Sequence, residues 1–343
     1  MNIPKKILVV RNDKIGDFVL SFQALAILKT SIPDSTITVL VPKYTAELAA
    51  ACEWIDNILI DPGSNTSLFQ ILNFYKTLRI LNFDAAITLF STTRIGVGLF
   101  FSNIPYRLAP ATKLAQIFYN HRCKQRRSRS LKSEYEYNSD LVRYFLSSHD
   151  IPIKNNIEPP YLSFEKHTIN QLHKYFCKIH NIPISNKLIF IHPGSGGSAS
   201  NLSLQQYASL IKELDISKKY SIVLTAGPNE ENIIFELSKL LDSVPHIKYI
   251  STEGLRRFSE HIQFCDLFIS GSTGPLHIAG ALNRPTAAFY PRRRSATFLR
   301  WQTLNSSENR LAFTPPTSAE ESDMSKIDII TAAEIIRNTF LTR

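Results

Sequence analysis

Short apolar runs alternate with segments of helical periodicity along this chain, and this alternation restricts the folds that it can adopt. In the first half, runs with the length and composition of buried strands lie at Lys6–Val10, Thr36–Val41, Asn57–Ile60 and Ala85–Phe90. Helical periodicity separates them at Asp17–Leu28, Tyr44–Ala51 and Ser67–Leu81. Strands separated by helices predict βαβ units, so we expect an α/β fold with a doubly wound parallel sheet.

The same pattern begins again in the second half. Predicted strands lie at 187–192, 221–225, 247–250, 267–269 and 286–290, and predicted helices at 203–214 and 230–241. Between the halves, after a helix predicted over 134–146, residues 150–160 are rich in Pro and Asn, which is typical of a connection. A chain of 343 residues is long enough for two cores. We therefore predict a first domain over 1–160 and a second that begins at 161.

Strands in the second half end in glycine-rich turns. The sequence Ser270-Gly-Ser-Thr-Gly-Pro-Leu-His-Ile-Ala-Gly-Ala-Leu-Asn-Arg-Pro285 follows the predicted strand at 267–269 and leads into a helix. Such a turn suits either an anion at a helix N-terminus or an ordinary tight connection. Two companion turns, at 194–197 and 226–228, are expected at the same carboxyl edge of the sheet, where α/β domains bind ligands. Together they favour a phosphate site.

Basic residues exceed acidic ones by ten and are clustered. Six lie between Arg122 and Lys132, and Arg292-Arg293-Arg294 form a second cluster. Such clusters attract phosphates of nucleic acids, anionic lipids or acidic substrates, although a solvated loop without a partner is an alternative. Aromatic residues that stack on bases are missing around 122–132, so we expect no nucleic-acid partner.

Neither a metal site nor a membrane span is expected. The four cysteines are scattered without metal-ligand spacing, and no apolar run reaches the roughly eighteen residues that a spanning helix needs. The N-terminus enters a strand almost at once, without a signal-peptide pattern. We expect a cytoplasmic protein.

Several blocks resemble glycosyltransferase family 9, the lipopolysaccharide heptosyltransferases. Arg11-Asn-Asp-Lys-Ile-Gly-Asp-Phe-Val-Leu20 is similar to the opening loop of the family. His192-Pro-Gly-Ser-Gly-Gly197, Ala226-Gly-Pro-Asn-Glu-Glu231 and Ser272-Thr-Gly-Pro-Leu-His277 are similar to its three donor-side loops, in the same order. The resemblance implies a GT-B fold, with two Rossmann-like domains facing across a cleft. It also implies a donor domain over 161–326 and a C-terminal helix, within 327–343, that returns to the first, acceptor-binding domain.

The resemblance implies an inverting glycosyltransferase in which Asp17 is the catalytic base. Such a reaction needs a base that takes the proton of the acceptor hydroxyl and groups that stabilise the departing diphosphate. Asp17 lies where the first loop meets a helix N-terminus. A helix cap is the alternative role for an Asp at this place.

Donor-binding residues follow from the same blocks, and the implied donor is ADP-heptose, with no further cofactor. The backbone at Ser272, Thr273 and Gly274 is expected to hold the diphosphate without a metal ion. His277 either faces the phosphates or packs in the core. The other implied donor-binding residues are Ser195, Gly196, Gly227 and Glu230, of which Glu230 is expected to accept hydrogen bonds from the ribose.

Two departures from the family pattern concern the donor. Relatives carry a lysine where this chain has Ser200, and an acidic residue where it has Ser272. Arg11, Lys14 or the arginines at 292–294 are candidates for the missing charge. Another nucleotide sugar, or an acceptor outside lipopolysaccharide assembly, therefore remains an alternative. A non-enzymatic protein that binds nucleotide sugar or nucleic acid is supported only by the charge.

The implied acceptor is a phosphorylated glycolipid of the lipopolysaccharide core. Arg11, Lys14, Arg126, Arg127 and Arg129 are the residues expected to bind it or its phosphates. An anionic membrane surface attracts such a basic loop by about 1 kcal/mol per Lys or Arg. We therefore expect peripheral association with the inner face of the membrane.

Overall fold

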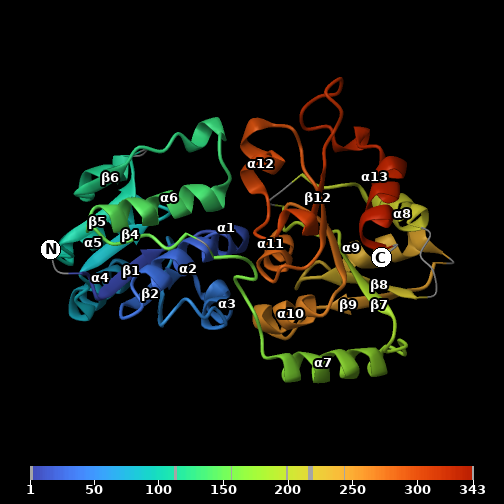
Figure 1. Cartoon of the computed structure of the whole chain (residues 1–343), viewed down its shortest axis with the longest axis horizontal. Helices are drawn as coiled ribbons and strands as arrows, with labels where there is room; N and C mark the ends of the chain where they lie inside the picture. The colour runs from blue at the N-terminus through green and yellow to red at the C-terminus, as the bar shows by residue number, and fades with distance from the viewer. Residues whose placement is uncertain are drawn as a thin grey trace. The chain divides into compact units, whose positions relative to one another are not determined.

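The computed structural model describes residues 3–111, 114–155, 157–197, 200–214, 219–242 and 244–341. The chain divides into two compact units, Met1–Tyr161 and Leu162–Arg343. Each unit contains one six-stranded sheet whose strands are all parallel, with helices on both faces (Figure 1). The predicted fold class, doubly wound α/β in both halves, is confirmed.

The first unit has the strand order β3-β2-β1-β4-β5-β6. α2 packs against α6 on one face of this sheet, and α4, α5 and the short helix η2 pack together on the other. The strands are β1 (Lys6–Val10), β2 (Thr36–Val41), β3 (Asn57–Ile60), β4 (Ala85–Thr88), β5 (Tyr106–Pro110) and β6 (His121–Cys123). The helices are α1 (Ile15–Val19), α2 (Phe22–Ser31), η1 (Lys43–Thr45), α3 (Ala46–Ala50), α4 (Leu68–Leu81), α5 (Thr93–Phe101), η2 (Leu114–Phe118), η3 (Arg127–Arg129) and α6 (Glu134–Ser147).

Buried central strands explain why the sequence pattern of the first unit is readable. In β1, four of the five residues are fully buried, because helices cover both faces of a parallel sheet. β1 pairs with β2 and β4, so that Val10 lies opposite Leu40 on one side and Thr88 on the other. The chain therefore leaves the middle of the sheet at Arg11, at its carboxyl edge.

The second unit has the strand order β12-β11-β10-β7-β8-β9. α8 packs against α9 and α13, whereas α10 packs against α7 and α11. The strands are β7 (Lys187–His192), β8 (Tyr220–Ala226), β9 (His246–Ile250), β10 (Leu267–Gly271), β11 (Thr286–Phe289) and β12 (Arg310–Phe313). The main helices are α7 (Lys166–Ile179), α8 (Leu204–Glu213), α9 (Glu231–Leu241), α10 (Gly254–Gln263), α11 (Gly274–Ala281), α12 (Phe298–Trp301) and α13 (Ile329–Ile336).

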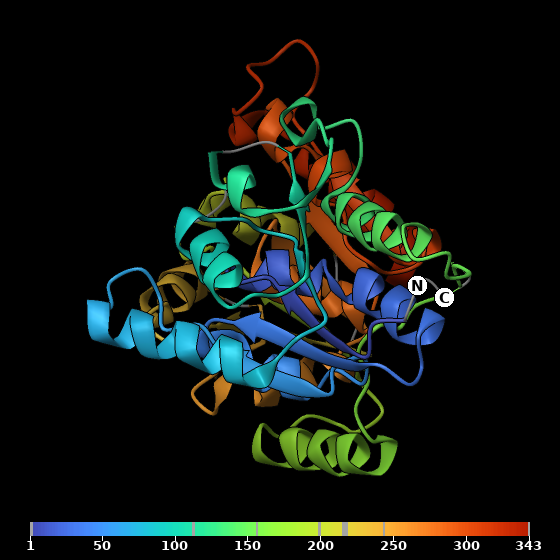
Figure 2. The same ribbon diagram turned by 90° about the vertical axis from the view of Figure 1, so that its left-hand side faces the viewer.

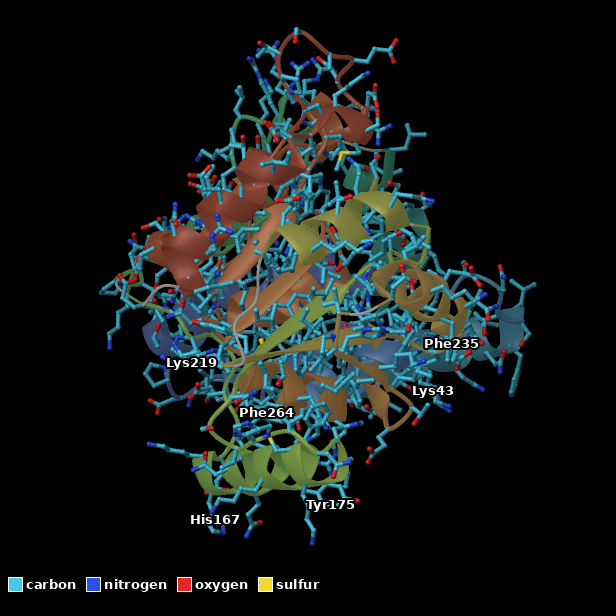
Figure 3. The ribbon with its side chains drawn as sticks, turned by 90° about the vertical axis from the view of Figure 1, so that its right-hand side faces the viewer. Lys43, His167, Tyr175, Lys219, Phe235 and Phe264 are labelled. Atoms are coloured by element: carbon cyan, nitrogen blue, oxygen red, sulfur yellow. The ribbon has the colours of Figure 1, made fainter. Side chains whose placement is uncertain are left out.

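α7 forms the outer layer of the second unit. The imidazole ring of His173 stacks on the ring of Phe264 at 5.0 Å between centroids, which attaches the helix to the chain after α10. On the opposite side of α7, His167 and Tyr175 project outward (Figure 3). Tyr175 is 62% exposed. This helix was not among the predicted elements.

The C-terminal helix, predicted to return to the first domain, packs within the second unit in the described part of the chain. Ile327, Ala332, Ala333 and Ile336 are buried in the same apolar cluster as the side chains of α8 and the strands of the second sheet. α13 lies against α8 (Figure 1). Its apolar face packs against buried side chains of α8, so the energy of burial keeps it within its own unit. Thr342 and Arg343 lie outside the described residues.

Other differences concern single elements. The helix predicted over 17–28 is two helices, α1 and α2, because the chain turns at Leu20 and Ser21. β5, β6, α5, α10 and β12 were not predicted. β6 and β12 are edge strands of three and four residues, too short to show a periodicity. Within the described residues, no helix is long and apolar enough to cross a membrane.

Candidate active site

Asp17 lies in the first turn of α1, just after β1. The residue at the N-cap of this helix is Lys14, and no side chain caps it. Asp17 instead accepts a hydrogen bond from Nη2 of Arg11 at 2.5 Å, and its side chain is 16% exposed. Asp17 therefore does not cap the helix, and its place in the first turn also favours the positive end of the helix dipole.

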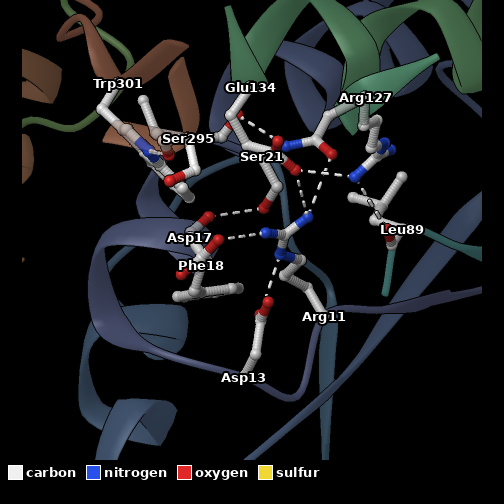
Figure 4. Close-up of polar contacts among 12 residues, drawn as sticks. Arg11, Asp13, Asp17, Phe18, Ser21, Leu89, Arg127, Glu134, Ser295 and Trp301 are labelled. Carbon is white, nitrogen blue, oxygen red and sulfur yellow. Dashed lines mark hydrogen bonds and ion pairs between the residues drawn. The ribbon is translucent and has the colours of Figure 1, made fainter. Parts of the chain in front are cut away.

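Arg11 is the centre of a buried polar cluster, shown in Figure 4. Its Nε donates to Asp13 at 2.8 Å, and its Nη1 donates to Glu134 at 3.0 Å and to Asn138 at 3.1 Å. Together with the bond to Asp17, these contacts engage all three nitrogens of the guanidinium group. Arg11 was predicted to bind an acceptor or its phosphates, but in the structure it positions three carboxylates instead.

Glu134 joins this cluster to the basic loop. It stands in the first turn of α6, whose positive dipole end favours a carboxylate, and it is 2% exposed. Its Oε1 also accepts from Nη1 of Arg127 at 2.6 Å, and Arg127 donates further to the backbone oxygen of Leu89 at 3.2 Å. Arg127 therefore points inward, although it belongs to the sequence cluster that includes the exposed Arg126 and Arg129.

Burial and crowding of the carboxylates change their proton affinities. Burial raises the pKa of Asp17 above its ordinary value; Arg11 lowers it again only in part, and the charge of Glu134 raises it further. Burial raises the pKa of Asp13 to about 7, because the charge of Arg11 offsets the cost of burial only in part and the charge of Asp17 adds to it. Three carboxylates share two guanidinium groups here, which favours retention of a proton in the cluster. A carboxylate with a raised pKa is a stronger base at neutral pH.

The three glycine-rich turns of the second unit lie at one edge of its sheet. They follow β10, β7 and β8, which are neighbours in the sheet. Ser195 and Gly196 come after β7, Gly227 after β8, and Ser272 after β10. The first-turn N–H groups of a helix lack partners within the helix, and α11 begins directly at the third turn. This edge can accommodate an anion.

Thr273 and His277 are almost fully buried. The hydroxyl of Thr273 caps α11 by accepting from the Leu276 N–H at 3.4 Å, and it shares a hydrogen bond with Ser270 at 3.0 Å. His277 is 3% exposed, and its Nδ1 has no hydrogen-bond partner among the described residues. Burial lowers the pKa of His277 to about 4, so the imidazole is neutral at pH 7. It therefore provides no positive charge for a phosphate.

Glu230 bridges two of the turns. Its Oε1 accepts from the Gly196 N–H at 2.9 Å, and its Oε2 from the Gly227 N–H at 3.2 Å. A Cβ at Gly194 would lie 2.4 Å from this carboxylate, so only glycine permits this approach. Glu230 was predicted to bind a ribose, but here both carboxylate oxygens hold the turns together.

The segment that lacks the family lysine carries neutral groups. Ser198 and Ala199 lie outside the described residues, and Ser200 is half-buried. Asn201 follows it, donates to the Pro193 oxygen at 2.8 Å and accepts from the Tyr207 hydroxyl at 2.6 Å. No cation replaces the lysine in the described part of this segment.

The candidates for the missing charge differ in availability. Nη2 of Arg292 donates to the backbone oxygens of Ala319 at 2.5 Å and Thr317 at 3.3 Å, which attaches it to a loop of its own unit. Arg293, Arg294 and Lys14 are exposed. Among the described residues, no group of three or more His, Cys, Asp or Glu side chains is arranged to hold a metal ion.

Sequence reasoning missed the carboxylate partners of Arg11. Asp13 and Glu134 were not among the predicted site residues, nor was Asn138. Asp13 is two residues from Arg11, but Glu134 and Asn138 are 123 and 127 residues away along the chain. The only sequence signal for Glu134 is its place beside a capping box, in which Ser133 and Glu136 satisfy each other.

Comparison with solved structures places the fold in a known class. The E. coli ADP-heptose LPS heptosyltransferase II matches with a TM-score of 0.78 at 18% identity, over 98% of this chain and 99% of that chain. An E. coli heptosyltransferase, WaaC, solved with ADP-2-deoxy-2-fluoro heptose, matches with a TM-score of 0.71 at 15% identity, over 97% and 99%. The two parallel α/β units therefore have the GT-B fold of these glycosyltransferases.

Sequence comparison identifies the family. The family model described as glycosyltransferase family 9 (heptosyltransferase) matches residues 71–320. A Haemophilus influenzae protein named "Putative glycosyltransferase" is 45% identical over 343 residues, which cover 98% of this chain and 99% of the relative. The chain belongs to glycosyltransferase family 9, as its motifs predicted, and is a glycosyltransferase.

Proposed function

We propose that this enzyme transfers a heptose from ADP-heptose, with inversion and without a metal ion, to a phosphorylated glycolipid of the lipopolysaccharide core. The observation that carries this proposal is the set of three glycine-rich turns after the neighbouring strands β10, β7 and β8. The N-terminus of α11 at the third turn suits a diphosphate, whereas the Gly196 and Gly227 N–H groups of the other two turns donate to Glu230. A solved structural relative contains an ADP-heptose analogue, which supports the choice of donor.

In the proposed reaction, Asp17 is the base. The acceptor hydroxyl gives its proton to a carboxylate oxygen of Asp17, while its oxygen forms a bond to the anomeric carbon on the face opposite the diphosphate. The bond between that carbon and the diphosphate oxygen breaks, and ADP leaves with the electron pair. The N-terminus of α11 stabilises the negative charge that develops on the diphosphate. The raised pKa of Asp17 supports its role as proton acceptor.

Asp17→Asn tests the base directly. The amide keeps an oxygen that accepts from Arg11, so the fold is expected to persist, whereas kcat is expected to fall by roughly 10²–10⁴. Turnover is measured with the donor at saturation, and thermal unfolding shows whether the variant is folded. A folded Asp17→Asn enzyme with nearly normal kcat would show that another group takes the proton.

A second candidate is transfer from a different nucleotide sugar, or to an acceptor outside lipopolysaccharide assembly. Ser200 and Ser272 favour it, because both replace charged residues of relatives. A thermal-shift panel of ADP, UDP, GDP and their sugars separates the two candidates. A ligand at a hundred times its Kd stabilises the native state by about 2.7 kcal/mol. Stabilisation by UDP or GDP ligands, but not by ADP ligands, would exclude ADP-heptose.

Lys14, Arg126 and Arg129 are the proposed contacts for the acceptor phosphates. All three are exposed and belong to the first unit. We do not include Arg11 and Arg127 among them, because their guanidinium groups bind the carboxylates around Asp17. A lipid-borne acceptor would place the enzyme at the inner face of the membrane as a peripheral protein.

A further inference from the structure

One stretch of the first unit carries the whole formal charge of the protein. Residues 62–133 contain eleven of the 39 Lys and Arg residues but only one of the 29 Asp and Glu residues. The rest of the chain therefore contains 28 of each and is formally neutral. The single acid, Asp84, accepts from the backbone N–H groups of Lys5 and Lys6, beside the start of β1 and away from the carboxyl edge. Arg94, Arg127 and Lys132 pair with acids outside the stretch, and the other bases leave it cationic.

The same stretch exposes large apolar side chains. Of the 21 exposed large apolar residues in the described parts of the chain, ten lie between residues 62 and 133. The most exposed are Leu114 (88%), Leu68 (79%), Phe69 (72%), Ile80 (71%) and Ile117 (69%). Single exposed apolar residues are common, but a concentration of this kind marks an interaction surface.

The helices that carry these side chains form one continuous layer. α5 lies between α4 and η2, and two glycines allow the close contacts. A Cβ at Gly98 would lie 2.4 Å from the ring of Tyr75 in α4, and a Cβ at Gly96 would lie 3.2 Å from Phe118 in η2. In Figure 2, α4 and α5, drawn in cyan to teal, lie on the side of the first unit that faces the viewer.

Arginines adjoin this layer directly. Nε of Arg107 donates to the backbone oxygen of Phe118 at 2.9 Å, and its guanidinium group lies 5.4 Å from the ring centre of Phe100. Nε of Arg122 donates to the backbone oxygen of Tyr119, just after η2, at 3.1 Å. The exposed Arg126 and Arg129 follow in the next loop. Apolar and cationic side chains therefore share one surface.

We propose that the layer of α4, α5 and η2, with the loop at 122–132, is a membrane-docking surface. Its partner is an anionic phospholipid bilayer: the exposed Arg122, Lys124, Arg126 and Arg129 bind the headgroups, and Leu114 and Ile117 enter the boundary of the acyl chains. A second copy of the chain does not fit this surface, because two such faces would bring like charges together. The inference deepens the proposed function, since it names the surface that approaches a lipid-borne acceptor.

Flotation of the full chain with vesicles tests the surface. We expect the protein to bind vesicles that contain phosphatidylglycerol and to bind phosphatidylcholine vesicles much more weakly, with loss at high salt. Arg126→Ser with Arg129→Ser should lower the partition coefficient roughly 30-fold, at about fivefold per charge. Leu114→Ser with Ile117→Ser should lower it at least about tenfold.

Matched control variants come from α7 of the second unit. Tyr175→Ser with Ile179→Ser removes two apolar side chains that are 62% and 51% exposed, and Lys174→Ser with Lys178→Ser removes two exposed charges from the same helix. Both are expected to bind vesicles as the wild type does. All the replaced side chains are exposed, and thermal unfolding verifies that each variant is folded.

The outcomes separate this inference from the proposed function. Absence of vesicle binding by the wild type, or equal losses in the α7 variants, would overturn the docking surface. A dimer that Leu114→Ser with Ile117→Ser dissociates, or binding to RNA in place of vesicles, would assign the surface to another partner and overturn it as well. Stabilisation by ADP ligands tests the donor site independently and should be the same in the Leu114/Ile117 variant.

Discussion

Glu134→Gln tests the polar cluster around Asp17 most sharply. The carboxylate of Glu134 is 2% exposed and accepts from two guanidinium groups, at 3.0 Å from Arg11 and 2.6 Å from Arg127. Glutamine has nearly the same shape, but it removes the negative charge and brings an amide N–H group next to hydrogen-bond donors. Asp17 and its bond to Arg11 are not altered directly. The variant therefore changes the electrostatics of the site and leaves the proposed base in place.

The expected loss of stability follows from the two hydrogen bonds. A hydrogen bond to a charged group contributes about 1.5–3 kcal/mol and a neutral one about 1 kcal/mol, so each bond weakens by about 1 kcal/mol. The sum is about 2 kcal/mol. The loss is somewhat smaller than this sum, because the variant also removes the repulsion between Glu134 and the other two carboxylates. For a unit of 161 residues, this corresponds to a fall in Tm of roughly 4–8 °C.

Glu134→Gln should also change the pH dependence of catalysis in one direction. The charge of Glu134 contributes to the raised pKa of Asp17, so its removal lowers that pKa. The acidic limb of the kcat/KM profile should shift to lower pH, and the rate on the plateau should fall because the base is weaker. A purely structural role for Glu134 would lower Tm without moving this limb.

The assay compares Glu134→Gln with Asp140→Asn on the same helix. Asp140 pairs with Lys132 and Arg143 near the surface, at 28% exposure, so its replacement should change stability by no more than about 1 kcal/mol. The pH dependence of kcat/KM and thermal unfolding are measured for both variants. An unshifted acidic limb in a folded Glu134→Gln enzyme would refute the electrostatic link between Glu134 and Asp17.

Three further predictions concern single residues. The pKa of Asp13 is about 7 in the folded state and 3.8 in the unfolded state. The contribution of Asp13 to the free energy of unfolding is therefore fully present below pH 3.8 and is lost as the pH rises through 7. Urea unfolding should show a loss of up to about 4 kcal/mol across this window, and Asp13→Asn should remove it; an unchanged slope would contradict the burial argument. Gly98→Ala should destabilise the protein by about 1–2 kcal/mol in thermal unfolding, since the contact with Tyr75 outweighs a gain in helix propensity of about 1 kcal/mol; a more stable variant would refute it. Glu230→Ala should weaken the binding of both ADP and inorganic diphosphate about tenfold in calorimetry, because two glycine turns lose their bridge; weakening for ADP alone would assign Glu230 to the ribose.

Much of the fold is local information and can be predicted from the sequence. The central strands β1, β2, β7 and β10 are mostly apolar and buried, because both faces of a parallel sheet are covered, and their positions follow from the sequence alone. The glycine-rich turns are also local, and their place at the carboxyl edge follows from the parallel arrangement. The family motifs lie in these same segments.

The sequence by itself thus determined the fold class, the family and the strand ends at which we propose that ligands bind. The tertiary structure alone decided which charges pair: it placed Glu134 beside Arg11, turned Arg127 inward, attached Arg292 to a loop and kept α13 on the second unit. Periodicity records only which face of an element is buried, whereas the partner of a charge depends on groups more than a hundred residues away. For that reason Arg11, a predicted phosphate ligand, is instead the residue that holds the carboxylate of Asp17.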